Sequence, residues 1–166
     1  MKRIIFLTGA SGVGNTSLVE SIEANHRQFK CYHFDSIGVP KLEDMEHRYG
    51  SAENWQKAMT GEWVSRLVSE SNQHSRVVIE GQVNIEFIFE SFNEHNVTEF
   101  EVYLISCSIE TLFDRLINKR NQPELANERM ANWLPFLSKQ AEGFNVIILD
   151  TDDLSVAECC DVILNN

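Results

Sequence analysis

The chain has 166 residues, 43% of them hydrophobic and 23% charged, which is typical of one soluble globular domain. A net charge of −11 and the lack of any basic run argue against a nucleic-acid partner, because an acidic protein repels the phosphate backbone. No apolar run approaches the roughly 20 residues that cross a bilayer, and the N-terminus lacks a signal peptide, so we expect no membrane partner and a cytoplasmic location.

Short apolar runs alternate with longer helical patterns along the chain. Several of these runs are apolar nearly throughout, as strands covered on both faces of a parallel sheet are. In chain order the predicted strands are Arg3–Thr8, Lys30–Phe34, Arg76–Glu80, Phe100–Ser106 and Asn145–Leu149. Predicted helices lie near Thr16–Asn25, Leu42–Tyr49, Ala52–Asn72, Ile85–His95, Ile109–Lys119, Ala126–Ala141 and Leu154–Leu164. This order predicts a single three-layer α/β/α domain over residues 1–166, with ligands bound beyond the carboxyl ends of the strands.

The first predicted strand runs into a glycine-rich turn and a helix, in the stretch "TGASGVGNTS". Gly9, Gly14 and Thr16 match the P-loop pattern G-x-x-x-x-G-K-[ST]. Glycines let successive amides face phosphate oxygens, the helix start adds its positive end, and the threonine hydroxyl can ligate Mg²⁺. We therefore expect Thr16 to be the metal ligand. The residues expected to bind the nucleotide here are Gly9, Gly12, Val13, Gly14, Asn15, Thr16 and Ser17.

Asn15 occupies the position where the P-loop pattern has lysine. An asparagine is shorter and neutral, so one charge-assisted contact worth on the order of 1.5–3 kcal/mol is lost. The loss is larger where charge shifts during phosphoryl transfer, so nucleotide binding is easier to retain than fast transfer. Two explanations stay open. Asn15 is an inactivating change, natural or introduced, or a basic residue from "DRLINKRNQPELANERM" replaces the lysine.

On this loop and this order of elements, the chain resembles the P-loop small-molecule kinases, which include nucleoside monophosphate, shikimate and gluconate kinases. The resemblance implies a five-stranded parallel sheet in the order 2-3-1-4-5 and a short lid at about residues 119–129. It also implies that a helical segment at about residues 40–72 walls the substrate pocket. Lids of this family supply arginines to the transferred phosphate and the adenine. By position these are Arg115, Arg120 and Arg129, with Arg120 first and Arg115 next, and Lys119 is a further candidate.

The same resemblance implies acidic residues after the second or third strand. Asp35 and Glu80 occupy those two places, where a carboxylate can accept a hydroxyl proton or orient the attacking oxygen. The turn after the fifth strand packs against adenine in the family. Asp150, with Thr151 and Asp152, holds that position here. Gln82 is a further candidate for a hydrogen bond to a polar substrate.

Together these residues predict an ATP-dependent, Mg²⁺-using phosphotransferase that moves the γ-phosphate to a hydroxyl of a small molecule. Its expected catalytic residues are Asp35, Glu80, Arg115 and Arg120. The alternative, favoured by Asn15, is a non-catalytic nucleotide-binding sensor or partner module. A plain α/β interaction domain without nucleotide is the third interpretation. The sequence does not identify the phosphate acceptor and does not favour ATP over GTP. It also does not show whether the chain forms a homodimer.

Other patterns have structural interpretations. Ser155 and Glu158 predict a capping box, and Pro135 predicts a kinked or split helix. His33 has no partner visible in the sequence and is interpreted as an ordinary structural histidine. A four-residue repeat predicts an apolar stripe packed in the core, with a tryptophan lining the substrate pocket as the alternative; its members are Trp55, Met59, Trp63 and Leu67.

Overall fold

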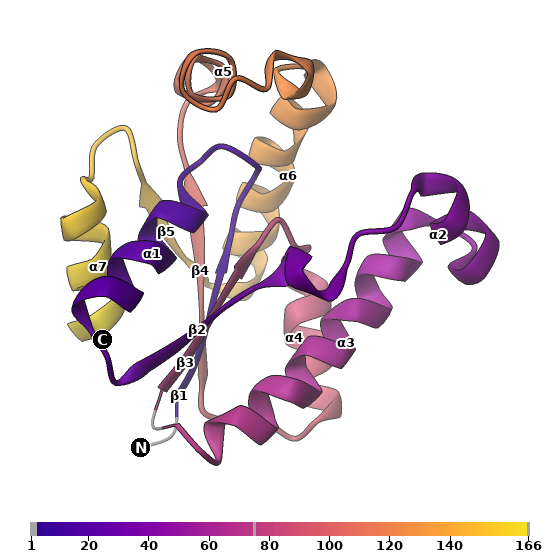
Figure 1. Cartoon of the computed structure of the whole chain (residues 1–166), viewed down its shortest axis with the longest axis vertical. Coiled ribbons are helices and arrows are strands. Elements are labelled where there is room, and N and C mark those ends of the chain that lie inside the picture. The colour runs from indigo at the N-terminus through magenta and orange to yellow at the C-terminus, as the bar shows by residue number, and fades with distance from the viewer. Residues whose placement is uncertain (1–2, 75, 166) are drawn as a thin grey trace.

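The computed structural model describes residues 3–74 and 76–165. Its parallel strands form a five-stranded sheet in the order β2-β3-β1-β4-β5 (Figure 1). The strands are β1 (Arg3–Thr8), β2 (Phe29–His33), β3 (Arg76–Gly81), β4 (Phe100–Ser106) and β5 (Ile147–Asp150). The predicted fold class and strand order are confirmed.

Helices precede or follow the strands as the sequence pattern predicts. The α-helices are α1 (Asn15–Asn25), α2 (Leu42–Tyr49), α3 (Ala52–Ser71), α4 (Ile85–Glu94), α5 (Ile109–Asp114), α6 (Glu128–Phe144) and α7 (Val156–Asn165). Shorter segments are the 3-10 helices η1 (Phe34–Ile37) and η3 (Pro123–Leu125) and the π-helical turn η2 (Arg115–Lys119). The helix predicted over residues 109–119 therefore widens into a π turn in its second half.

Two details of the helices test the finer predictions. The capping box is confirmed, because the Ser155 amide donates to the Glu158 carboxylate over 2.9 Å and the Glu158 amide donates to Ser155 Oγ over 3.3 Å. Of the kink or split predicted at Pro135, the split is wrong, since α6 continues through this residue. Pro135 lies on the exposed side of the helix and has no N–H to donate.

The two faces of the sheet are covered by different helices (Figure 1). Alternate residues of β1 point to opposite faces, with Ile5 and Leu7 packed against α1 and α7, and Ile4 and Phe6 packed against α3 and α4. The predicted core stripe on α3 is confirmed, because its tryptophans and Leu67 are buried. These two apolar layers fix the sheet rigidly beneath the loops.

The carboxyl ends of the strands meet at one edge of the sheet. Register places His33 beside Glu80, Thr8 beside Gly81, and Ser106 beside Asp150. From this edge α2 and the start of α3 project as an arm to one side (Figure 1). Among the described residues, no helix combines the length and apolar character needed to cross a membrane.

Candidate functional site

A cavity of about 860 Å³ lies at the carboxyl edge of the sheet, and we call it the first cavity. The loop between β1 and α1 forms its floor, and the end of β3, η1, η2 and the turn after β5 form its sides. It gathers residues from Gly9 to Val156, which are 147 positions apart in the sequence. The predicted site residues that line it are Gly9, Gly12, Val13, Gly14, Asn15, Thr16, Ser17, Asp35, Glu80, Arg115 and Arg120.

Two positions of the glycine loop do not accommodate a residue larger than glycine. Gly14 caps α1 with φ 116° and ψ 9°, a left-handed conformation that favours glycine. At Gly9 an added Cβ would overlap the carbonyl oxygen of Ile105 and lie 2.7 Å from a methyl group of Val13. The chain therefore passes close to β4 at Gly9 and turns sharply at Gly14.

This geometry leaves backbone donors unpaired at the loop. The Ser11 amide donates to Gln82 and the Val13 amide donates to the Ala10 carbonyl. Five other amides donate no hydrogen bond within residues 3–74 and 76–165, because they lie in the loop or in the first turn of α1. They belong to Gly12, Gly14, Asn15, Thr16 and Ser17. Such a set at a helix N-terminus binds anions, phosphate above all.

Asn15 turns its side chain back into the loop. Its Nδ2 donates to the Gly9 carbonyl over 3.1 Å, and the residue is only 7% exposed. Its Oδ1 is buried and has no hydrogen-bond partner among the described residues. Asn15 thus ties the two ends of the loop together, and it brings no positive charge to the cavity.

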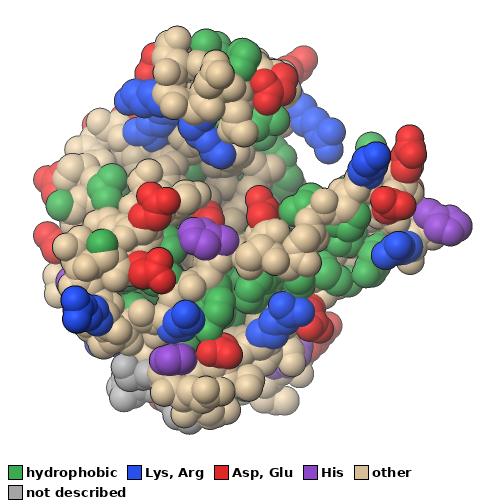
Figure 2. All heavy atoms as spheres, viewed as in Figure 1, with side chains coloured by type: hydrophobic (Ala, Val, Ile, Leu, Met, Phe, Trp, Pro, Cys, Tyr) green, Lys and Arg blue, Asp and Glu red, His purple; other side chains and the backbone are tan. Residues whose placement is uncertain are grey.

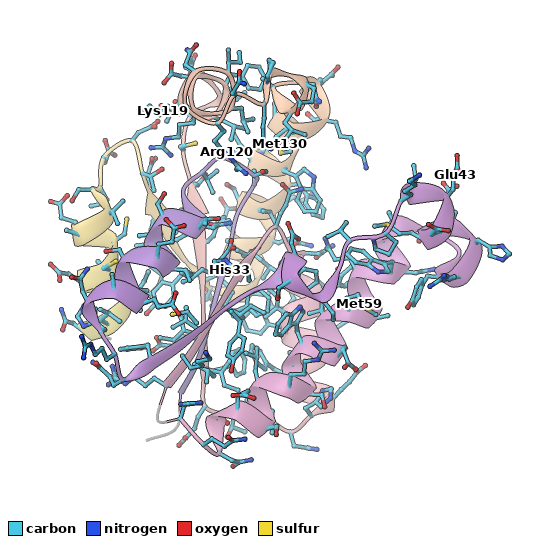
Figure 3. The ribbon with its side chains drawn as sticks, viewed as in Figure 1. His33, Glu43, Met59, Lys119, Arg120 and Met130 are labelled. Atoms are coloured by element: carbon cyan, nitrogen blue, oxygen red, sulfur yellow. The ribbon has the colours of Figure 1, made fainter. Side chains whose placement is uncertain are left out.

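Three cations reach the first cavity from η2 and its end. Arg115 Nη1 donates to the Val13 carbonyl over 2.7 Å and to Thr151 Oγ1 over 2.8 Å. Arg120 Nη1 donates to Ser11 Oγ over 3.1 Å, and Lys119 lines the same wall. In Figure 3 Lys119 and Arg120 lie close together in the upper part of the molecule, and His33 lies below them near the middle. None of these cations forms an ion pair with a described residue, so their charge is available to an anion.

Arg115 begins the π turn η2, and its side chain reaches the glycine loop from there. The Arg120 amide donates to the Arg115 carbonyl five residues earlier, over 2.9 Å, which widens the helix at this point. Thr151 Oγ1 donates in turn to the Val13 carbonyl over 3.0 Å and to the Ser106 carbonyl over 3.1 Å. Arg115 and Thr151 therefore join the glycine loop, η2 and the end of β5 in one hydrogen-bonded unit.

Two carboxylates face the cations across the first cavity. Glu80 is 9% exposed, and its Oε1 lies 2.7 Å from Nδ1 of His33. Burial raises the pKa of Glu80 above its ordinary value of 4.5, while hydrogen bonds from His33 and Thr16 oppose this rise and the nearby Asp35 adds to it. Asp35 is exposed on η1. A buried carboxylate with a raised pKa, beside an anion cradle, fits a proton acceptor.

Some predicted residues lie elsewhere, and some contacts were missed. Asp150 does not line the first cavity; its Oδ1 accepts from the Asp152 amide over 2.9 Å, and Thr151 lines the wall instead. Gln82 accepts a hydrogen bond from the Ser11 amide over 2.7 Å, which fixes the loop to the end of β3. The His33–Glu80 contact was also missed, although the predicted strand ends hinted that the two would lie close.

A second cavity of about 730 Å³ opens beside the first, between the arm and the start of α6. Figure 2 shows the corresponding notch, with hydrophobic side chains exposed along the arm. Its described lining residues are Val39, Leu42, Met45, Ala52, Glu53, Trp55, Gln56, Gln82, Asn84, Leu125, Asn127, Arg129, Met130, Trp133 and Phe136. Trp55 therefore belongs both to the core and to a cavity wall, and Arg129 lies here and not in the first cavity.

This sheet order, the glycine loop before α1 and the cation-bearing segment after α5 together define the fold of the P-loop small-molecule kinases. No protein-family model matches the chain, and no curated protein matches its sequence. Solved structures do match its fold. A gluconokinase from Sinorhizobium meliloti is 15% identical with a TM-score of 0.67, over 99% of this chain and 90% of that one.

Two further solved structures give the same result. A shikimate kinase from Acinetobacter baumannii, in complex with shikimate, is 17% identical with a TM-score of 0.63, over 98% of this chain and 90% of that one. The deoxyadenosine kinase from M. mycoides with bound dATP is 14% identical with a TM-score of 0.62, over 99% and 98%. At these identities the likeness establishes the fold.

Proposed function

We propose that this chain is an ATP-dependent phosphotransferase that moves the γ-phosphate of ATP to a hydroxyl of a small molecule. One observation carries the proposal: a single cavity is lined by five amides of the loop and the first turn of α1 and by three cations, none of which pairs with a described residue, together with two carboxylates. Amides and cations suit a polyphosphate, and carboxylates suit a hydroxyl proton. The kinase fold supports the same activity.

The nucleotide would occupy the floor of the first cavity. The free amides of the loop would hold its phosphates, and Arg115 and Arg120 would pair with phosphate oxygens. Leu154 and Val156, which line the same cavity beyond Thr151, would form an apolar wall for the base. Because Arg115 is already fixed to Val13 and Thr151, it needs little reordering when a phosphate arrives.

The donors present fit Mg²⁺. The Thr16 hydroxyl and the carboxylates of Glu80 and Asp35 are the hard oxygen ligands that Mg²⁺ prefers, and all three line the first cavity. Within the described part of the chain, no group of three or more acidic, histidine or cysteine side chains could hold a metal alone. Thr16 would therefore hold the ion together with phosphate oxygens. Bound there, Mg²⁺ would supply charge neutralisation.

In the reaction, Glu80 or Asp35 would orient the acceptor hydroxyl and take up its proton. A bond then forms between the acceptor oxygen and the γ-phosphorus, and the bond from that phosphorus to the bridging oxygen of ADP breaks. Arg120 and Lys119 would stabilise the negative charge on the transferred group. Arg120 and Lys119 would thereby supply part of the positive charge that the P-loop pattern assigns to a lysine at position 15.

Calorimetry and product analysis test the proposal. We expect heat on titration of ATP with Mg²⁺, and ADP release with transfer of phosphate to at least one member of a panel of sugars, nucleosides and aminoglycosides. Faster transfer is expected from Asn15→Lys. The absence of heat with magnesium nucleotides from both the native chain and Asn15→Lys would refute nucleotide binding, and the phosphotransferase with it.

The second candidate is a nucleotide-binding sensor without turnover. The inward direction of Asn15 favours it, because no loop side chain then carries a positive charge to the phosphates. Nucleotide binding without transfer, in both the native chain and Asn15→Lys, would support this candidate over the phosphotransferase.

A further inference from the structure

We propose that the second cavity binds the acceptor, and that this acceptor is an uncharged hydroxyl compound with an aromatic or similarly flat apolar ring. The inference rests on the proposed function, since it identifies the class of substrate that receives the phosphate. Three features of the second cavity support it: its position beside the first cavity, its apolar walls and its charge.

The two cavities adjoin each other. Val39, Gln82, Leu125 and Met130 line both of them. A molecule in the second cavity can therefore extend past these residues toward Glu80, which lines the first cavity beside the loop. With about 730 Å³, the second cavity matches the volume of sites for drug-sized ligands.

The walls of the second cavity are strongly apolar and partly aromatic. Trp133 and Phe136 lie on α6 with ring centroids 5.5 Å apart, and Trp55 faces the same cavity from α3. Leu42 is 50% exposed and Phe136 43% exposed, which is unusual for large apolar side chains gathered around one opening. Covering these side chains with an apolar ring would remove their surface from water, which favours binding.

Polar side chains in the second cavity are mostly committed to the protein. Gln56 donates to the Gln82 carbonyl and accepts from the Asn84 amide. The Asn84 side-chain oxygen accepts from Glu86 and Gln140. Gln56 and the Asn84 side-chain oxygen therefore brace the wall, and apolar side chains make up most of the lining that a ligand would contact.

Charge in the second cavity is sparse. Of the described residues that line it, Glu53 and Arg129 carry opposite charges, so they offer no surplus of cations for a carboxylate or a phosphate. The cations of the first cavity lie beside the glycine loop, where a nucleotide would use them. A net charge of −11 further disfavours an anionic acceptor. The cavity therefore selects against acidic acceptors.

Calorimetry without nucleotide tests the inference directly. The probes are the methyl ester of para-(hydroxymethyl)benzoic acid, the para-(hydroxymethyl)benzoate anion and mannitol. We expect the ester to bind about ten-fold more tightly than the anion, and more tightly than mannitol. Leu42→Ser and Phe136→Ser should each weaken binding of the ester about five-fold. Ile109→Ser is the matched control, because Ile109 is 48% exposed and lines neither cavity.

The outcomes separate this inference from the proposed function. Equal binding of ester and anion, or an equal loss in Ile109→Ser, would overturn the inference. Unchanged binding in both Leu42→Ser and Phe136→Ser, with each variant folded by circular dichroism, would overturn it as well. Selective binding of the ester without phosphate transfer from ATP supports the cavity assignment while contradicting the phosphotransferase.

Discussion

Nδ1 of His33 lies 2.7 Å from Oε1 of Glu80, across paired positions of β2 and β3. The Glu80 carboxylate is nearly buried, whereas the His33 side chain is 42% exposed. Burial raises the pKa of Glu80, and the hydrogen bond from His33 is the largest influence that opposes the rise. His33 therefore holds Glu80 closer to the ionised state that a proton acceptor needs, as a positioning residue that acts through Glu80.

Replacing His33 should shift the pH dependence of the reaction. With Glu80 as the proton acceptor, only its ionised form can take the hydroxyl proton, so kcat/KM should rise as pH passes the pKa of Glu80, which is raised above 4.5. In His33→Ala this acidic limb should move to higher pH, because the opposing hydrogen bond is gone. His47→Ala, on the exposed surface of α2, is the control. An acidic limb at the same pH in His33→Ala and the native chain would contradict this role.

Glu80 should also make stability depend on pH. A carboxylate whose pKa is raised in the folded state contributes stability that is fully present below its unfolded value, near 4.5, and lost as pH rises through the folded value. Glu80→Gln removes that titration. The unfolding free energy of Glu80→Gln minus that of the native chain, from urea titrations, should therefore increase as pH rises through this range. A difference that stays constant with pH would argue against the raised pKa.

Much of the fold and the cavity could be predicted from the sequence. Apolar runs located the strands, the rule that ligands bind at the carboxyl ends of parallel strands located the site, and the resemblance to the P-loop small-molecule kinases implied Asp35 and Glu80. Contacts that depend on register or on side-chain direction could not be predicted in this way. The His33–Glu80 pair requires β2 and β3 to be neighbours in a known register. The Asn15 side chain turns inward because it donates to the Gly9 carbonyl, and hydrophobic periodicity does not predict such a contact.

Restoring a lysine in the glycine loop should increase the transfer rate. Asn15→Lys adds a positive charge beside the unpaired amides, and one charge-assisted contact is worth about 1.5–3 kcal/mol, or roughly ten-fold or more in kcat. Asn15→Ala, which only removes the bond to Gly9, should not increase kcat and should lower the unfolding free energy by about 1 kcal/mol. Steady-state ADP release and urea unfolding measure the two effects. Equal kcat in the lysine and alanine variants would exclude a missing cation as the defect.

Arg120 should act on the transferred phosphate. Its guanidinium reaches the loop at Ser11 and forms no ion pair with a described residue, so its charge is free to stabilise the transition state. We expect Arg120→Ala to lower kcat on the order of a hundred-fold with a smaller effect on ATP affinity. Arg27→Ala serves as the control, since Arg27 is exposed before β2, away from both cavities. An equal fall in both variants would point to lost net charge and not to a placed cation.

The close contact between Gly9 and β4 can be tested without knowing the phosphate acceptor. A methyl group there would overlap the Ile105 carbonyl, and backbone of a central strand cannot move aside as a flexible side chain can. Gly9→Ala should therefore lower the unfolding free energy by about 2 kcal/mol and abolish the heat of ATP binding, because the loop must shift off β4. Gly61→Ala is the matched control. Nothing lies within 4 Å of a methyl group at that helical position, so this change should raise the unfolding free energy by about 0.5–1 kcal/mol and leave ATP binding unchanged. Native-like ATP binding by Gly9→Ala would show that the phosphates do not depend on this loop geometry.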